Sequence, residues 1–88
     1  MRIKLVLFSS KECGRCSALR PKLEELALSY GASFEEVDID RNPEVAAEKM
    51  VFTAPAVILE VDGKESARWA GIFPLTMIES LLRRITAP

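Results

Sequence analysis

Apolar and polar positions along the first half of the chain predict a strand, a helix and a second strand. The run from Ile3 to Phe8 is apolar on both faces in its second half, which is typical of a central strand in a layered α/β sheet. From Cys16 onward, apolar residues recur at helical spacing until Gly31, a residue suited to a helix C-cap. We therefore expect a helix over residues 13–30 and a second strand over residues 34–39.

The next part of the chain predicts a short helix and a hairpin. Residues 42–44, Asn-Pro-Glu, supply an N-cap type, an N1 proline and a first-turn acid, for a helix expected to end near residue 50. A buried strand is expected at residues 56–59. Asp62-Gly63 is the strongest short hairpin signal in the chain, and it leads to an antiparallel strand at about residues 65–70.

A last helix follows the hairpin. Gly71 breaks the strand, and Pro74 starts a helix at its first turn. The apolar positions of this helix fall on one face, as expected for a helix packed on a sheet. They are Leu75, Ile78, Leu82 and Ile85.

The order βαβαββα defines the fold class as α/β. The alternating first half requires a right-handed parallel crossover, and the hairpin adds antiparallel strands. The simplest packing is a four-stranded mixed sheet flanked by three helices, with helices on both faces. The 88 residues are expected to form one domain, residues 1–88, because a chain of this size holds a single core.

Charge and composition describe an ordinary globular protein. The chain has 12 basic and 13 acidic side chains, so no basic excess is available to attract nucleic acid or anionic lipid. The apolar N-terminal run is too short for a signal peptide or a membrane span, and it meets charged residues without a cleavage site. We therefore expect a cytoplasmic monomer with neither nucleic-acid nor membrane partners.

Two cysteines carry the candidate chemistry. Cys13 and Cys16 have the C-x-x-C spacing and lie where a strand leads into a helix, about one helical turn and roughly 5 to 6 Å apart. A helix N-terminus favours a thiolate, so Cys13 is the expected reactive sulfur. In a reducing cytoplasm this spacing indicates a catalytic or metal-binding pair. With two cysteines and no histidine, no metal is expected, and two small buried hydrophobes are the other interpretation.

Several local motifs resemble the thioredoxin-like superfamily, over nearly the whole chain. Phe8 stands five residues before Cys13, and Pro21 stands five residues after Cys16. Residues 40–43, Asp-Arg-Asn-Pro, resemble the Asp-x-Asn-Pro that follows the next thioredoxin strand. Residues 53–55 look like the cis-proline loop of the family. The resemblance implies a thioredoxin fold.

The resemblance also implies where a substrate would bind. In the family, the cis-proline lies against the two sulfurs and the backbone of the preceding residue pairs with an extended substrate segment. These roles pass to Pro55 and Ala54 here. A glycine after the last strand also fits the family. The residues expected to contact substrate are therefore Arg15, Thr53, Ala54, Pro55 and Gly71.

Four positions depart from the thioredoxin pattern. Glu12 stands in the place of a tryptophan, and Arg15 in the place of a proline. Leu7 replaces a buried aspartate, and Glu36 replaces a lysine near the end of the next strand. The usual general base is therefore missing. Glu36 and Glu12 are the candidates for proton transfer with Cys16.

Glutaredoxins provide the second comparison within the superfamily. They commonly carry Cys-Pro-Tyr-Cys and a Gly-Gly-x-x-Asp-like segment that holds glutathione, whereas residues 70–74 here are Ala-Gly-Ile-Phe-Pro. Glutathione therefore lacks its expected second anchor. The compact length is nevertheless glutaredoxin-like, so the chain is similar to small thioredoxin-like and glutaredoxin-like proteins.

The leading hypothesis is a thiol-disulfide oxidoreductase that takes part in electron transport and cell redox homeostasis. Cys13 would attack a protein disulfide, and Cys16 would resolve the mixed disulfide. The charge of Arg15 and the helix should hold the pKa of Cys13 below the free value of about 8.5. No cofactor is expected besides the redox-active disulfide. A thioredoxin-reductase-like or other donor would return the electrons.

Two other functions stay open at this point. One is a glutathione-dependent glutaredoxin, and the other is a redox-inert binding module that keeps the fold for docking. An apolar docking patch around the sulfurs is a further hypothesis. Its candidate members are Phe52, Trp69, Ile72 and Phe73, of which Ile72 and Phe73 are favoured because they follow Gly71 in a loop.

Overall fold

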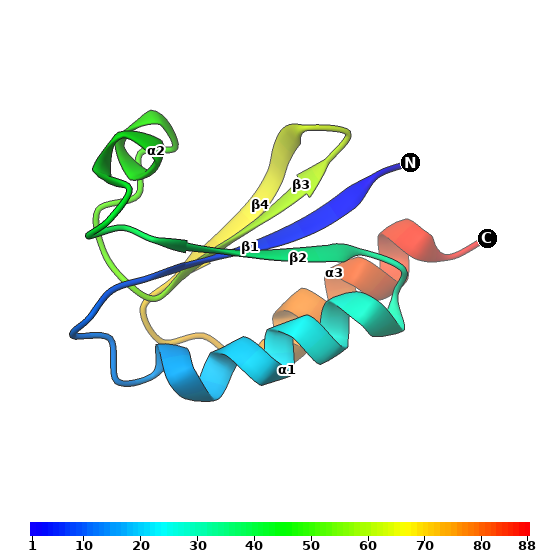
Figure 1. The fold of residues 1–88 in the computed structure, drawn as a ribbon. Coiled ribbons are helices and arrows are strands. Elements are labelled where there is room, and N and C mark those ends of the chain that lie inside the picture. The colour runs from blue at the N-terminus through cyan, green and yellow to red at the C-terminus, as the bar shows by residue number, and fades with distance from the viewer.

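The computed structural model describes all residues 1–88 and has the predicted element order, βαβαββα (Figure 1). The strands and helices fall within a few residues of the positions expected from the sequence. Their bounds are β1 Ile3–Ser9, α1 Cys16–Ser29, β2 Ser33–Asp38, α2 Pro43–Glu48, β3 Ala56–Val61, β4 Lys64–Ala70 and α3 Leu75–Thr86.

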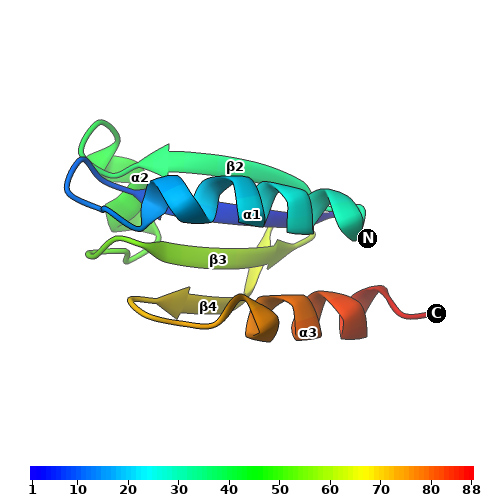
Figure 2. The same cartoon turned by 90° about the horizontal axis from the view of Figure 1, so that it is seen from below.

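The four strands form one mixed sheet in the order β2-β1-β3-β4. β1 pairs with β2 in parallel and with β3 in antiparallel fashion, and β4 is antiparallel to β3. The predicted central position of β1 is confirmed. Figures 1 and 2 show α1 and α3 lying side by side on one face of the sheet, with α2 on the other face. The predicted mixed sheet with helices on both faces is therefore confirmed.

The double-sided β1 divides the core into two parts. Leu5 and Leu7 belong to a cluster of 12 buried residues that includes side chains of α1 and α3. Val6 and Phe8 point the other way, into a smaller cluster of 7 buried residues that includes Ala46 of α2. Successive strand side chains alternate between faces, so an all-apolar run can serve both clusters at once.

The helix α1 begins later than the sequence predicted. Its first residue is Cys16 and not residue 13. The backbone N–H of Cys13 bonds to the Ser10 carbonyl at 3.2 Å, and that of Cys16 bonds to the Cys13 carbonyl at 3.3 Å. These two tight turns carry the chain out of β1. The residues before Cys16 are therefore used in turns, and the two cysteines lie on different elements.

The C-terminus of α1 ends as the sequence indicated. Gly31 has a φ of +71°, the left-handed conformation that glycine adopts without a steric penalty. Its N–H bonds to the Leu28 carbonyl at 3.2 Å, and the N–H of Ala32 bonds to the Ala27 carbonyl at 2.8 Å. This is a Schellman motif, and Ala27 and Ala32 are both buried in the larger core cluster.

The helix α2 is shorter than predicted. It ends at Glu48, because the chain reverses at Met50, which has a φ of +56°. Asn42 is the N-cap residue, but its side-chain amide donates to the Asp38 carbonyl at 3.1 Å and does not cap the helix. The predicted N-cap position is confirmed, and the helix ends two residues before the expected end near residue 50.

A polar contact holds α2 against the sheet, since its apolar stripe is weak. Arg68 on β4 donates to the Lys49 carbonyl at 2.7 Å and to the Met50 carbonyl at 3.2 Å. These carbonyls follow the C-terminus of α2, where a cation is favourable. Lys49 also pairs with Glu60 of β3 at 3.3 Å. Residues from β3 and β4 therefore fix the end of α2.

The last two elements differ little from expectation. Asp62 and Gly63 form the β3–β4 turn with positive φ at both positions, as a two-residue hairpin loop requires. Pro74 is the N-cap residue of α3 and not its first helical residue.

None of the helices has the length and apolar character needed to cross a lipid bilayer.

The contribution of the larger core cluster can be measured with two leucines of α1. Leu23 is fully buried, whereas Leu28 is 73 % exposed. Leu23→Ala is expected to lower the free energy of unfolding by about 2–5 kcal/mol, because it leaves a cavity under the sheet. The matched control, Leu28→Ala, should change it by about 0.5 kcal/mol or less. Urea unfolding followed by circular dichroism measures both, and equal losses would contradict this account of the core.

Candidate functional site

Three loops meet at one end of the sheet, the end where β1 finishes. Phe8 near the end of β1 pairs with Ala56 at the start of β3, and Ala56 pairs with Ala70 at the end of β4. The loop after β1, the loop before β3 and the loop after β4 therefore leave the sheet together. They carry Cys13, Pro55 and Gly71, and the loop after β1 leads directly into Cys16 at the start of α1.

Cys13 and Cys16 form a disulfide, with their Cα atoms 5.5 Å apart. The two residues differ in exposure. Cys16 is the first residue of α1 and is only 2 % exposed, whereas Cys13 lies in the preceding turn and is half-buried. A reagent or partner at the surface therefore meets Cys13 first.

The N-terminus of α1 is open beside this disulfide. Arg15 is its N-cap residue, and no side chain caps the helix there. The first N–H groups of a helix have no partner within the helix, and they carry the positive end of its dipole. These donors and this dipole are arranged to favour a negative charge on the sulfur that precedes the helix.

The loop before β3 lies against the loop after β4. The peptide bond between Ala54 and Pro55 is cis, as predicted, and Pro55 is buried. The Pro55 carbonyl accepts the backbone N–H of Gly71 at 3.0 Å. Ala54 is half-buried and Thr53 is exposed. This hydrogen bond ties Pro55 to the loop after β4. The two residues before Pro55 face the surface.

Arg15 connects the loop after β1, residues 10–15, to the same glycine; we call this segment the cysteine loop. Its Nη1 atom donates to the Gly71 carbonyl at 2.6 Å. Gly71 therefore makes hydrogen bonds on both sides, to Pro55 through its N–H and to Arg15 through its carbonyl. The sequence placed both residues among those expected to contact substrate, but nothing in it indicated that they bind each other.

Glu36, one of the two candidates for proton transfer, is held by two side chains. Arg20 donates to both of its carboxylate oxygens, and the Ser9 hydroxyl donates to Oε2 at 2.8 Å. The hydrogen bonds from Arg20 hold the pKa of the Glu36 carboxyl below its ordinary value, and Ser9 adds to the shift against the effect of partial burial. A lower pKa makes Glu36 a weaker base. Glu12, the other candidate, is exposed.

Sequence reasoning missed Ser9 and Arg20. Ser9 is the only buried polar residue in the protein, and it lies at the end of β1. Arg20 follows Cys16 by about one turn of α1, and its pairing with Glu36 fastens that helix to β2. A serine at the end of an apolar run and an arginine on a helix carry no signal for such a pairing.

The docking-patch hypothesis needs one correction. Phe73, favoured as an exposed residue, is 8 % exposed and packs in the larger core cluster. The loop after Gly71 turns this ring inward, toward α1 and α3. Its neighbour Ile72 is 90 % exposed, and Phe52 is 76 % exposed. Trp69 is half-buried against the core. Two of the four candidates, Ile72 and Phe52, therefore present apolar surface.

A hollow of about 460 Å³ lies beside the cysteine loop, on the β2 side. Its lining includes residues 10–12 from the loop after β1, residues 39 and 40 after β2, and residues 52–54 before the cis-proline. The backbone N–H of Lys11 donates to the Asp40 carboxylate at 2.9 Å across it. No group of three or more His, Cys, Asp or Glu side chains is placed to hold a metal ion.

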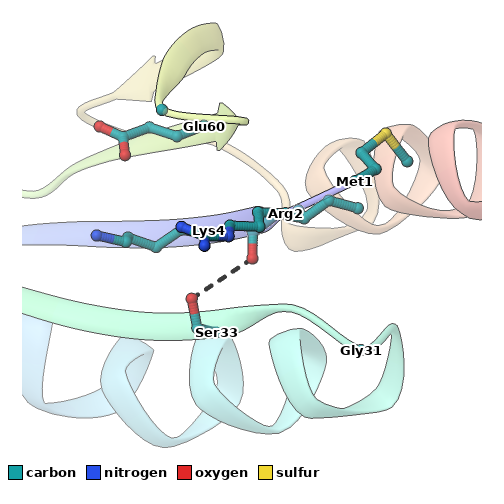
Figure 3. Close-up of a pocket in the computed structure, with 8 residues that line it drawn as sticks. Met1, Arg2, Lys4, Gly31, Ser33 and Glu60 are labelled. Carbon is teal, nitrogen blue, oxygen red and sulfur yellow. Dashed lines mark hydrogen bonds between the residues drawn. The ribbon is translucent and has the colours of Figure 1, made fainter.

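A second hollow, of about 470 Å³, lies at the opposite end of the sheet, where β1 begins. Figure 3 shows that the Met1 and Lys4 side chains run in opposite directions along its walls. The one hydrogen bond drawn joins the Ser33 hydroxyl to the Ile3 carbonyl, at 3.5 Å. Neither the cysteines nor the cis-proline lies near it, so the candidate site is at the other end.

Comparisons with known proteins agree with this geometry. The family model described as thioredoxin matches residues 1–84. A thioredoxin of Staphylococcus epidermidis is 35% identical over 82 residues, which cover 91% of this chain and 79% of that protein.

Solved thioredoxin structures have the same fold. Thioredoxin 1 of Thermosipho africanus superposes with a TM-score of 0.88 at 30% identity, over 93% of this chain and 92% of its own. The thioredoxin of Fasciola hepatica gives a TM-score of 0.82 at 34% identity, over 94% of this chain and 80% of its own.

The Glu36–Arg20 pair predicts a pH-dependent contribution to stability. Because the pKa of Glu36 is lowered in the folded protein, the pair stabilises the fold above the ordinary carboxyl pKa of about 4.3, and this is lost as pH falls through the lowered value. Glu36→Gln should cost about 1 kcal/mol or less at neutral pH and nothing near pH 2.

Urea unfolding across this pH range measures the loss, with Glu25→Gln as the matched control. Glu25 is an exposed residue of α1 whose carboxylate makes no ion pair. Glu25→Gln should show no pH-dependent loss in the free energy of unfolding. A loss in Glu36→Gln that is the same at pH 7 and at pH 2 would refute the electrostatic interpretation.

Proposed function

The chain belongs to the thioredoxin family and is a protein disulfide oxidoreductase, and we propose that it reduces partner disulfides with Cys13 as nucleophile and Cys16 as resolving thiol. The unequal exposure of the two bonded cysteines supports this assignment most directly. Cys13 is accessible to a partner, whereas Cys16 is buried and is bonded to Cys13.

The reaction proceeds by two exchanges of sulfur partners. The Cys13 thiolate attacks one sulfur of the partner disulfide, that S–S bond breaks, and the other partner sulfur leaves as a thiolate that takes up a proton. Cys16 then loses its proton and attacks the Cys13 sulfur, which releases the second partner thiol. Two electrons have passed from the dithiol to the partner, the two partner sulfurs have taken up one proton given up by Cys16 and one from the solvent, and Cys13 is bonded to Cys16.

The loops around the disulfide suit an extended substrate. The backbone of Ala54, next to the cis peptide bond, is the proposed partner for the main chain of the substrate, with Thr53, Pro55 and Gly71 around it. Pro55 and Gly71 hold each other by a hydrogen bond, so this wall is formed before a substrate arrives. Preformed walls lower the entropic cost of binding.

The proton of Cys16 has two proposed acceptors, Glu36 and Glu12. The Arg20 contacts lower the affinity of Glu36 for a proton, so it would pass a proton on quickly after receiving it. Glu12 is exposed and exchanges protons directly with water.

The cycle needs an external electron donor and no bound cofactor. We propose a thioredoxin-reductase-like flavoenzyme or another dithiol donor, with the protein acting as a cytoplasmic monomeric electron carrier in cell redox homeostasis. The near balance of 12 basic and 13 acidic side chains disfavours binding to a polyanion.

Two enzyme assays separate this proposal from its rivals. We expect the protein to accelerate reduction of insulin by dithiothreitol, and to turn over a glutathione mixed disulfide poorly. Cys13→Ser should return insulin reduction to the background rate, because no attacking thiolate is left. Cys16→Ser should stop after the first exchange with the partner attached to Cys13, because the resolving thiol is missing. Mass spectrometry identifies that adduct.

The other outcomes point to the other functions. Rapid turnover of the glutathione mixed disulfide without insulin reduction would indicate a glutaredoxin. No activity in either assay, with cysteines that alkylating reagents fail to modify after reduction, would indicate a redox-inert binding module. An insulin activity that survives Cys13→Ser would eliminate the assigned nucleophile.

A further inference from the structure

Building on the proposed function, we propose that Arg15 determines substrate specificity, by binding a carboxylate that flanks the attacked cysteine of a partner disulfide. Disulfides beside acidic residues are then the class of substrate that the site prefers. The position of the guanidinium, its free donors and the charges around it support this preference.

The guanidinium is anchored to the loop after β4, and it belongs to a residue two positions after the attacking cysteine. Arg15 lies between the two cysteines in the chain, and its Nη1 atom is tied to the Gly71 carbonyl at 2.6 Å. Gly71 is in turn tied to Pro55 at 3.0 Å. The side chain therefore spans from the cysteine loop to the loop after β4. A charged group fixed in this way loses less conformational entropy on binding a ligand than a free arginine does.

Most hydrogen-bonding capacity of this guanidinium is unused. An arginine carries five N–H donors, and the contact with Gly71 is the only side-chain hydrogen bond that Arg15 makes. Arg15 is exposed and takes part in no ion pair, unlike Arg20 and Arg68. A guanidinium with free donors binds a carboxylate with two parallel hydrogen bonds. A substrate with a neutral or basic side chain in place of the carboxylate cannot form this charged pair.

The two sides of the cysteine loop differ in charge. The segments next to the guanidinium, residues 13–23 and 66–78, contain no aspartate or glutamate. On the other side, Glu12 and Asp40 line the hollow toward β2, together with one basic residue, Lys11. An acidic substrate residue is therefore attracted more strongly to the Arg15 side, where no carboxylate opposes it, than to the β2 side.

Activated peptides test this directly. Each peptide has capped ends and one cysteine, activated as a mixed disulfide with neutral thiopyridine, and the residues on both sides of the cysteine are Asp, Asn or Lys. The Cys13 thiolate bonds to the peptide sulfur, the bond to thiopyridine breaks, and the released thiopyridone is followed by its absorbance. The second-order rate constant is measured for the reduced protein and for Arg15→Met, Arg15→Lys and Arg84→Met.

The measured quantity is the ratio of the Asp rate to the Asn rate. Substituting Arg15 by Met should lower this ratio about two- to fivefold at low ionic strength, the range of an exposed ion pair. Arg15→Lys, which keeps the charge but loses the planar fork, should fall between. Arg84→Met removes an exposed arginine of α3 that makes no ion pair, and it should leave the ratio unchanged. About 0.5 M salt should shrink the effect of Arg15.

The ratio separates recognition from general reactivity. If Arg15 acted only on the reactivity of Cys13, its loss would slow all three peptides by the same factor and leave the ratio unchanged. An unchanged ratio in Arg15→Met overturns the specificity proposal while the oxidoreductase proposal stands. A protein that reacts with no peptide, although a simple thiol does, overturns the oxidoreductase proposal, and the specificity proposal fails with it.

Discussion

The site depends on a disulfide that crosses the boundary between core and surface. Cys16 is held in the interior because it opens α1, and α1 is fastened to the sheet by buried leucines and by the Arg20–Glu36 pair. Cys13 is kept near the surface because two tight turns lead the chain out of β1 before the helix begins. The two thiols have the same chemistry, but their different exposure makes Cys13 the attacking thiol and Cys16 the resolving thiol.

The rest of the fold supplies the walls of this site. β1 runs antiparallel to β3, and β3 runs antiparallel to β4, so the loop before β3 and the loop after β4 emerge where β1 ends. Two hydrogen bonds then connect Pro55, Gly71 and Arg15 in series. The cysteine loop, the cis-proline and the glycine therefore act as one preorganised surface, although long stretches of chain separate them.

The sequence predicted what local patterns encode. The apolar run of β1, the Asp62-Gly63 turn and the position of Gly31 each follow from periodicity or backbone preference within a few residues. The predicted start of α1 was wrong, because the helical spacing of side chains does not show where the backbone hydrogen bonds of the helix begin. The Arg15–Gly71 and Arg20–Glu36 contacts, which join residues 56 and 16 positions apart, have no local signature. The burial of Phe73 was also missed, since it depends partly on α1, a helix distant from Phe73 in sequence.

Site-mapped alkylation of the reduced protein tests the central claim most directly. Iodoacetamide is added across a pH series, and mass spectrometry measures the label on each cysteine of the folded chain. The account predicts that Cys13 is labelled first, with an inflection below the free-thiol pKa of about 8.5, and that Cys16 stays unlabelled until the protein unfolds. Equal labelling of the two cysteines, or an inflection for Cys13 at or above the free value, would contradict it.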